Sequence, residues 1–237
     1  MKMWNMNIRA TPAALYGEPA EGVFLFVHGQ CGCKEEAARF AEIAAPHGWQ
    51  VLAMDLPEHG GRRDGATLTP WNAVPELQEM LQFAKARWNR IGLRAISIGA
   101  WLSLQAFAGE KLERCLLSSP LLDMEDMIFA RMRALGVTEA QLKEQGEIAA
   151  PEGAALSWRY LTWVREHPTR AICDCTAILY ATGDELIPRA TIDRFAERFA
   201  CRVTLYPGGR HWLRTKEECA FMKRWEEAEI IPPEMGR

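Results

Sequence analysis

The stretch R-A-I-S-I-G-A-W-L-S, residues 94–103, decides the fold of this chain. A short apolar run over residues 93–96 predicts a strand, and the spacing over 100–108 predicts a helix that follows it almost at once. A strand that turns directly into a helix forces the residue at the apex, here Ser97, into strained backbone dihedrals. The turn therefore predicts that the Ser97 side chain projects from the carboxyl end of a sheet, where sites form in α/β proteins.

The neighbours of Ser97 fit such a turn, although its usual form, Gly-x-Ser-x-Gly, has glycine where this chain has Ala95. Ala95 and Gly99 are both small, which is the property that the geometry needs. The backbone N–H of Ile98 would lie at a helix N-terminus, where it can donate to an oxyanion. Two interpretations of Ser97 are open on this stretch alone: a catalytic nucleophile, or an ordinary serine that caps the following helix.

The rest of the chain alternates apolar runs with helical patterns. This order predicts an α/β fold with a mostly parallel central sheet and helices on both faces. The first two runs, residues 4–8 and 13–16, predict antiparallel strands at an edge of that sheet. Pro75 either kinks the helix in which it lies or marks the true start of that helix. The other predicted strands cover residues 23–27, 50–55, 93–96, 114–118, 177–181 and 202–206, and the predicted helices cover 35–45, 70–88, 100–108, 189–199 and 215–228.

Residues 121–170 interrupt this order, because they carry helical patterns and no clear strand. A helical insertion in an α/β sheet is most simply a short cap over its top. The chain is therefore expected to divide into a core, residues 1–120 and 171–237, and a helical cap, residues 121–170. Trp158 and Trp163 of the cap are candidates for contact with a substrate, and packing within the cap is the alternative interpretation. The helices predicted in the cap cover residues 124–135, 138–144 and 156–167.

A serine nucleophile needs a base within hydrogen-bonding reach and a group that orients the base. His211 follows the predicted strand at 202–206, and Asp184 follows the predicted strand at 177–181. The carboxyl ends of parallel strands meet at one edge of a sheet, so both side chains are expected near Ser97. The alternative interpretations are a surface-loop histidine and an acidic turn residue.

Five motifs in order make the chain resemble the α/β-hydrolase superfamily, and within it the small capped serine esterases and related acyl hydrolases. FVHGQCG at 26–32 resembles the oxyanion loop of the family, and DLPEHGGR at 55–62 resembles its D-x-x-G-H-G-x-S segment. AISIGA at 95–100 resembles the nucleophile elbow. GDELIP at 183–188 and GGRHW at 208–212 resemble the loops that carry the acid and the histidine.

The resemblance implies a serine hydrolase that cleaves a carboxylic ester or thioester of a small molecule with an acyl group. Ser97 would be the nucleophile, His211 the general base and Asp184 the orienting acid. The backbone N–H groups of Gln30 and Ile98 would form the oxyanion hole. No cofactor and no metal are implied. The same triad would also serve a peptidase or amidase, or an acyltransferase, and a non-catalytic binding protein on the same fold is the alternative from another class.

Some residues depart from the family pattern or compete for a role. Gln30 stands where an apolar or aromatic residue is common, and Cys31 and Cys33 beside it are unusual. Asp123 is the rival to Asp184 as the acid, because some branches of the family place the acid after that strand. His28 and His59 are expected to be structural.

Composition excludes several other classes of function. The formal net charge of the 237 residues is −3, so there is no electrostatic reason to expect nucleic acid as a partner. No stretch approaches the roughly 20 apolar residues of a membrane span, and the N-terminus lacks the apolar core of a signal peptide. We therefore expect a cytoplasmic protein. Four of the seven cysteines form two C-x-C pairs, Cys31/Cys33 and Cys173/Cys175, a spacing that does not favour zinc.

Overall fold

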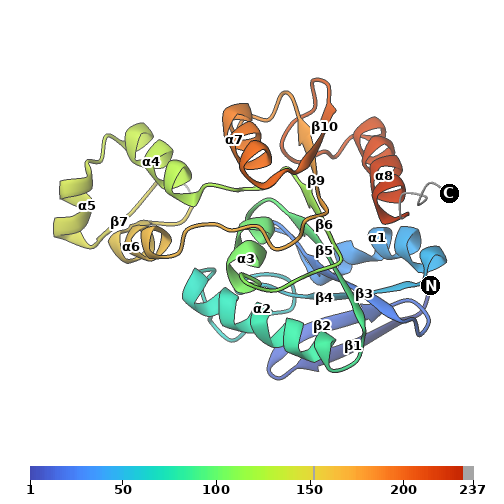
Figure 1. Ribbon diagram of the computed structural model, residues 1–237. Helices are drawn as coiled ribbons and strands as arrows, with labels where there is room; N and C mark the ends of the chain where they lie inside the picture. Colours follow the sequence, from blue (N-terminus) through green and yellow to red (C-terminus); the bar gives the residue numbers. More distant parts are fainter. Residues whose placement is uncertain (152, 232–237) are drawn as a thin grey trace.

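The computed structural model describes residues 1–151 and 153–231. Within these residues an eight-stranded sheet with the order β1-β2-β4-β3-β5-β6-β9-β10 forms the centre of the molecule (Figure 1). Its strands are β1 Met3–Ile8, β2 Thr11–Tyr16, β3 Gly22–Val27, β4 Trp49–Met54, β5 Arg90–Ile96, β6 Arg114–Ser118, β9 Thr176–Ala181 and β10 Arg202–Tyr206.

The sheet is mostly parallel, as the sequence predicted. Strands β4, β3, β5, β6, β9 and β10 pair in parallel, whereas β2 pairs antiparallel with both β1 and β4. The prediction of antiparallel strands at the N-terminus is confirmed, with the difference that β1 alone lies at the edge and β2 is paired on both sides.

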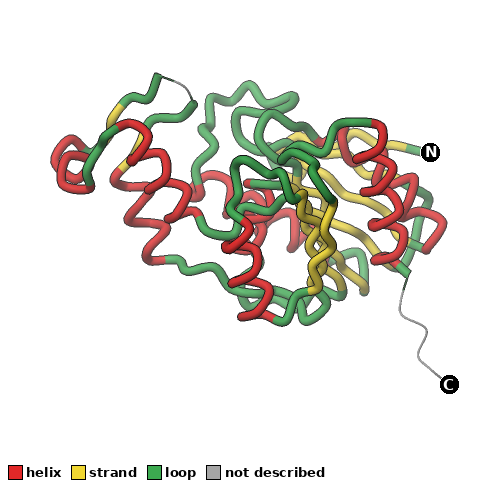
Figure 2. Tube along the Cα trace, turned by 90° about the horizontal axis from the view of Figure 1, so that it is seen from above, coloured by secondary structure: helices red, strands yellow, loops and turns green. Residues whose placement is uncertain are grey.

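Helices cover both faces of this sheet (Figure 2). Helices α1 and α8 bury their apolar side chains in one core cluster, and α2, α3 and α7 bury theirs in a second cluster on the opposite face. The predicted fold class is therefore confirmed. These helices are α1 Ala37–Ala44, α2 Pro70–Lys85, α3 Ile98–Ala106, α7 Arg189–Phe199 and α8 Lys216–Ile230, and two short 3₁₀ turns, η1 Lys34–Glu36 and η2 Ala45–His47, flank α1.

The register of the parallel strands brings five loops to one edge of the sheet. Val27 at the end of β3 pairs with Ala95 of β5, and Ile96 pairs with Ser118 at the end of β6. In the same way β9 and β10 end together, because Ala181 pairs with Tyr206. The loops after β3, β5, β6, β9 and β10 therefore leave the sheet side by side.

The insertion, residues 121–170, forms a group of helices to one side of the sheet (Figure 1). It holds α4 Met124–Leu135, α5 Glu139–Gln145 and α6 Trp158–Glu166, close to the bounds that the spacing predicted. Two short strands, β7 Glu147–Ile148 and β8 Leu156–Ser157, pair antiparallel within it and were not predicted. Strands of two residues are too short to show an alternating pattern, which explains their absence from the prediction.

Helix α2 shows that Pro75 does not mark the true start of the helix. The helix begins at Pro70, after Thr69 in an extended conformation, and Pro75 lies inside it. Proline is well placed at the first helical position, whereas Pro75 removes one donor from the helix interior. The described residues include no helix that is both long enough and apolar enough to cross a membrane.

A buried ion pair joins the central strand β5 to α8. Arg94 and Glu226 are each 1% exposed, and the guanidinium donates from Nε to Glu226 Oε1 at 2.8 Å. It also donates to the Ala95 carbonyl and to the Ser118 hydroxyl, so it ties together β5, β6 and α8. The two partners are 132 positions apart in the sequence, and the apolar pattern of β5 did not indicate the pair.

We predict that Arg94→Met lowers the free energy of unfolding by about 3–5 kcal/mol, because it leaves the Glu226 carboxylate buried without its partner. The double variant Arg94→Met/Glu226→Leu removes both charges and should recover most of that loss. Urea denaturation measures both quantities. A double variant no more stable than Arg94→Met would contradict this account of the pair.

Candidate active site

Ser97 occupies a strained turn between β5 and α3. Its φ is 50° and its ψ is −122°, a region that L residues rarely adopt. Backbone hydrogen bonds hold it there: Ser97 N–H donates to the Ser118 carbonyl at 3.2 Å, and the Ser97 carbonyl accepts from Leu121 N–H at 3.1 Å. Strain of this kind persists only where the surrounding structure imposes it, and it is concentrated at functional sites.

The first turn of α3 lies directly against the loop that follows β3. A Cβ added to Gly99 would lie 2.2 Å from the His28 carbonyl oxygen and 2.8 Å from that of Val27, so only glycine fits there. Ala95 already carries a Cβ and is fully buried in β5, next to Val27 of β3. Of the two small neighbours of Ser97, Gly99 is therefore the one that the geometry requires.

We predict that Gly99→Ala lowers the free energy of unfolding by at least about 3 kcal/mol, the upper end of the usual cost of overpacking. The reason is that the added methyl group must displace backbone atoms rather than a side chain. The matched variant Ala95→Gly should cost only about 0.5–1 kcal/mol, the conformational entropy of a glycine in a strand. Thermal and urea denaturation compare the two. Equal losses in both variants would show that the contact at Gly99 does not constrain the fold.

The structure brings the three predicted catalytic side chains into one chain of hydrogen bonds. Ser97 Oγ lies 2.9 Å from His211 Nε2, and His211 Nδ1 lies 2.8 Å from Asp184 Oδ2. The imidazole and the carboxylate are almost fully buried, and Ser97 is 8% exposed. With Nδ1–H donating to Asp184, Nε2 is the ring atom that can accept the Ser97 proton.

The Asp184 carboxylate is fixed by the backbone that follows it. Its Oδ1 accepts from Leu186 N–H and Ile187 N–H, both at 2.9 Å, which leaves Oδ2 for the histidine. Gly183 ties this loop to the loop after β10, since its N–H donates to the Gly209 carbonyl at 3.0 Å. The D-E-L-I-P pattern therefore has a local physical meaning, because it forms a turn that aims one carboxylate oxygen at His211.

Asp123, the alternative candidate for the acid, is the N-cap of helix α4. Its carboxylate accepts from Asp126 N–H at 2.9 Å and caps the N-terminus of α4. His211 has its acid partner in Asp184 instead.

The backbone N–H groups expected to form an oxyanion hole flank Ser97. Ile98 is the first residue of α3, so its N–H has no acceptor within the helix. Gly29, just before Gln30, lies against Ser97: a Cβ added to Gly29 would be 3.3 Å from Ser97 Cβ. The Gln30 side chain is exposed beside them. The N–H groups of Gln30 and Ile98 therefore belong to the two segments that meet at the nucleophile.

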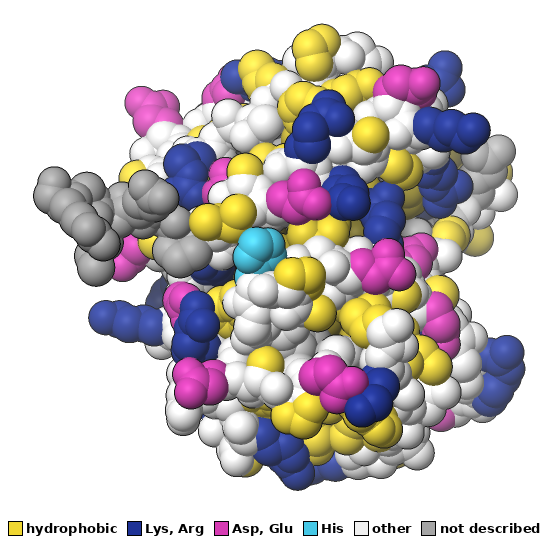
Figure 3. Space-filling view, turned by 90° about the vertical axis from the view of Figure 1, so that its right-hand side faces the viewer, with side chains coloured by type: hydrophobic (Ala, Val, Ile, Leu, Met, Phe, Trp, Pro, Cys, Tyr) yellow, Lys and Arg dark blue, Asp and Glu magenta, His cyan; other side chains and the backbone are white. Residues whose placement is uncertain are grey.

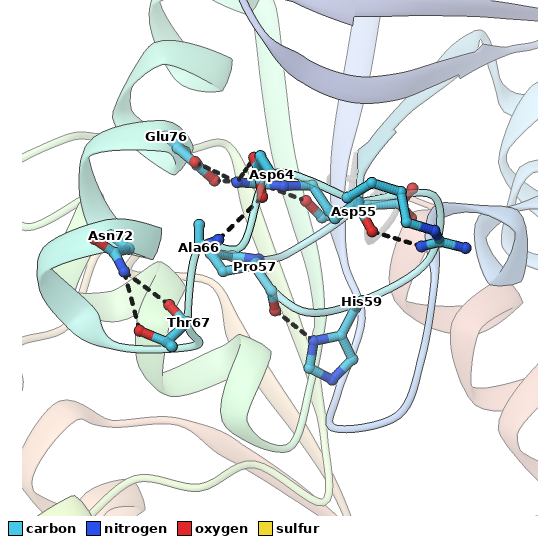
Figure 4. A network of polar contacts seen from close by, with 10 residues as sticks. Asp55, Pro57, His59, Asp64, Ala66, Thr67, Asn72 and Glu76 are labelled. Carbon is cyan, nitrogen blue, oxygen red and sulfur yellow. Dashed lines mark hydrogen bonds and ion pairs between the residues drawn. The ribbon is translucent and has the colours of Figure 1, made fainter.

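Two histidines brace the loop that carries Gln30. His28 is fully buried, its Nδ1 donates to the Gly29 carbonyl at 2.8 Å, and its Nε2 accepts from Leu56 N–H at 3.1 Å. His59 Nε2 accepts from Cys31 N–H at 2.9 Å, and its Nδ1 donates to the Pro57 carbonyl (Figure 4). Both rings therefore join the loop after β3 to the loop after β4, in agreement with the structural role expected of them.

A network of charges holds the loop after β4 in place. Asp55, fully buried, accepts from Lys34 N–H and Nζ and from Gly61 N–H at 2.8–2.9 Å. The buried Arg62 pairs with both carboxylate oxygens of Glu76 and with Asp64, which Figure 4 shows close to Glu76. These contacts give the acid, the histidine and Gly61 of DLPEHGGR a structural role in this loop.

The pKa of His28 supports a prediction about stability. Burial lowers this pKa from 6.5 to about 4, because a charged ring would be desolvated and its Nε2 could no longer accept from Leu56. At a pH between 4 and 6.5, His28 is therefore protonated in the unfolded chain and neutral in the folded protein. The free energy of unfolding should therefore fall by roughly 3 kcal/mol as the pH falls from 6.5 to 4.

The matched variant is His28→Gln, whose amide does not titrate and can still donate and accept. Urea denaturation at intervals between pH 7 and pH 4 should give a shallower loss of stability for this variant than for the wild type. Parallel pH profiles for the two proteins would show that His28 does not carry the effect.

The aromatic side chains of the insertion pack on the core. The Trp163 ring lies 5.7 Å from that of Trp101 in α3 and stacks on His167 at 3.9 Å. Tyr160 contacts Trp101 as well. Trp158, half-buried, lies under the ammonium of Lys143 within the insertion. These contacts give Trp163 a packing role. Contact of Trp158 or Trp163 with a substrate stays a prediction.

The cysteines are all free thiols. Cys31 is exposed beside Gln30 with a φ of 62°, and Cys175 N–H donates to the sulfur of Cys173. Among the residues that the structure describes, no group of three or more His, Cys, Asp or Glu side chains is placed to hold a metal ion.

Comparisons with known proteins relate the structure to α/β hydrolases. No protein-family model matches the chain, and no curated protein matches it in sequence. The structure is similar to that of Est1E from Butyrivibrio proteoclasticus with ferulic acid bound, with a TM-score of 0.72 and 17% sequence identity over 95% of this chain and 96% of that one.

Two further solved structures give the same result. Alpha/beta hydrolase domain-containing protein 10 from mouse has a TM-score of 0.74 and 16% identity over 97% of this chain and 98% of that one. A soluble variant of monoglyceride lipase from Saccharomyces cerevisiae has a TM-score of 0.65 and 15% identity over 98% and 96%. The chain has the α/β-hydrolase fold, as the sequence motifs predicted.

Proposed function

We propose that this protein is a serine hydrolase that cleaves carboxylic esters or thioesters through an acyl-enzyme on Ser97. The observation that carries the proposal is the unbroken line of hydrogen bonds from Ser97 Oγ through His211 to Asp184. The fold adds support, because its solved neighbours include proteins named esterase and lipase. What each residue does follows from the geometry.

In the first half-reaction Ser97 Oγ attacks the acyl carbon while His211 Nε2 takes its proton. Asp184, held by two backbone donors, keeps the ring oriented and stabilises the imidazolium that forms. The N–H groups of Gln30 and Ile98 stabilise the tetrahedral oxyanion. His211 then returns the proton to the leaving alcohol or thiol, whose bond to the acyl carbon breaks.

In the second half-reaction water attacks the acyl-enzyme. His211 takes a proton from the water, a second tetrahedral intermediate forms in the same oxyanion hole, and its collapse releases the acid and restores the Ser97 hydroxyl. The residues of this cycle need neither a metal nor a cofactor. The insertion, residues 121–170, acts as a cap in this proposal, since it begins just after β6, at the edge of the sheet where the triad lies.

We predict that Ser97→Ala lowers kcat/KM for p-nitrophenyl esters, from acetate to decanoate, by at least about 10⁴-fold. The matched control is Ser119→Ala. Ser119 also has a positive φ, of 43°, at the same edge of the sheet, but its buried hydroxyl has no hydrogen-bond partner among the described residues. This control should keep most of the activity of the wild type.

Hydrolysis of the ester series by the three proteins, with and without a reagent that blocks thiols, is the test. Activity that survives in Ser97→Ala, or that thiol blocking removes, would place the nucleophile elsewhere. An absence of turnover on every ester would favour a binding protein on the hydrolase fold.

A further inference from the structure

A cavity of about 320 Å³ opens beside the triad on the face of the sheet that α1 and α8 cover. Its lining includes Gly29 and Gln30 of the oxyanion loop, Ile96 just before Ser97, and Trp212 just after His211. The Trp212 ring is 39% exposed and stands edge-on to the His211 ring at 5.0 Å. The cavity therefore begins at the segments that hold the nucleophile, the base and the oxyanion donors.

The polar side chains of this cavity carry a net positive charge. Three arginines, Arg39, Arg94 and Arg214, line it, against the two acids Glu36 and Glu226. Desolvation raises the pKa of Glu36, and the charges of Arg214 and Arg39 oppose that effect. If all five groups are ionised, the lining has one positive charge in excess.

The two arginines at the mouth are the ones available to a ligand. Arg94 on the floor is fully engaged with Glu226 and its other acceptors. By contrast, neither Arg39 nor Arg214 forms an ion pair with a carboxylate among the described residues. Arg39 donates to the sulfur of Met222 at 3.5 Å, and the Arg214 guanidinium lies 5.1 Å from the centroid of the Trp212 ring.

The floor of the cavity carries the carboxylate of Glu226. Glu226 Oε2 is buried and has no hydrogen-bond partner among the described residues, although the residue is only 1% exposed. This oxygen would repel a carboxylate of the occupant, so the negative group is expected at the arginines of the mouth and not at the floor.

The electrostatic attraction of an anionic ligand is confined to the arginines of the cavity. Figure 3 looks onto the side of the molecule where α1 and α8 lie and shows basic side chains interspersed with acidic and apolar ones. With a net charge of −3 for the whole chain, a general field would not draw in anions. Selectivity for an anion must therefore come from contact with the arginines themselves.

We propose that this cavity is a subsite for the carboxylate of an acidic ester substrate, held by Arg39 and Arg214 while the ester reaches Ser97. The inference rests on the function proposed above and narrows it to esters that carry an anionic group. A guanidinium recognises a carboxylate by paired hydrogen bonds, and Trp212 provides an apolar wall for the carbon chain between the ester and the acid.

The test compares acidic esters with neutral esters of the same size. Mono-p-nitrophenyl glutarate is paired with p-nitrophenyl valerate, which places the acid on the acyl side. The second pair, 4-acetoxybenzoate and its methyl ester, places the acid on the leaving group. The preference is the kcat/KM of the acidic ester divided by that of its neutral partner. We expect this ratio to fall about tenfold in Arg39→Gln/Arg214→Gln for at least one pair, mainly because KM for the acidic ester rises. The pair that responds identifies the side that enters the cavity.

Two further variants separate charge recognition from a structural effect. Arg214→Lys should retain part of the preference, because it keeps the charge. Arg224→Gln removes an exposed arginine of α8 that does not line the cavity, and it should leave both rates unchanged. A preference that survives in the double variant, or the absence of any preference in the wild type, would overturn the proposal.

Binding without turnover distinguishes this proposal from the proposed function. In Ser97→Ala, calorimetry on both pairs should show that at least one acidic ester binds about tenfold more tightly than its neutral partner and that the two arginine substitutions abolish the difference. Such binding together with an inactive wild type would keep the subsite and contradict the hydrolase. Equal binding of the acidic and the neutral ester in both pairs would contradict the subsite whether or not the enzyme is active.

Discussion

The close approach of α3 to the loop after β3 is the constraint on which the rest of the site depends. Gly99 has no side chain, and this absence allows the first turn of α3 to lie against the carbonyl groups of Val27 and His28. As a result the Ile98 N–H and the Gly29–Gln30 segment lie on either side of Ser97. The strain at Ser97 is the cost of this arrangement, and it is carried by backbone hydrogen bonds to the neighbouring strand and loop.

The same type of side chain serves two purposes at this site because the acceptors around it differ. His28 and His59 each accept from a backbone N–H and donate to a backbone carbonyl, so both ring nitrogens are committed to holding loops together. His211 donates to a carboxylate that backbone donors fix in place, and its second nitrogen faces the hydroxyl of Ser97. Only this last arrangement leaves a proton free to move during a reaction.

Much of the fold could be predicted from the sequence because its elements have strong local signals. The bounds of α4, α7 and β10 match the prediction, since their periodicity and flanking residues are unambiguous. The short strands β7 and β8 could not be predicted, because two residues carry no period. Pro75 inside α2 is a case in which tertiary packing outweighs a local preference.

The candidate site divides in a similar way. Ser97, Asp184 and His211 each follow a strand, and parallel strands bring such positions together, so their proximity could be predicted from order alone. The buried pair of Arg94 with Glu226 and the cavity between Arg39 and Arg214 join residues far apart in the chain. No local pattern marks them, because only the packing of α1 and α8 on the same face of the sheet creates these contacts.

The proposed function depends on activation of the Ser97 hydroxyl by His211. The most direct measurement is labelling of the folded protein with a fluorophosphonate, followed by mass spectrometry of its peptides. The account predicts a single adduct, on the peptide that contains Ser97, and its loss in both Ser97→Ala and His211→Gln. Labelling of another residue, or undiminished labelling in His211→Gln, would contradict it.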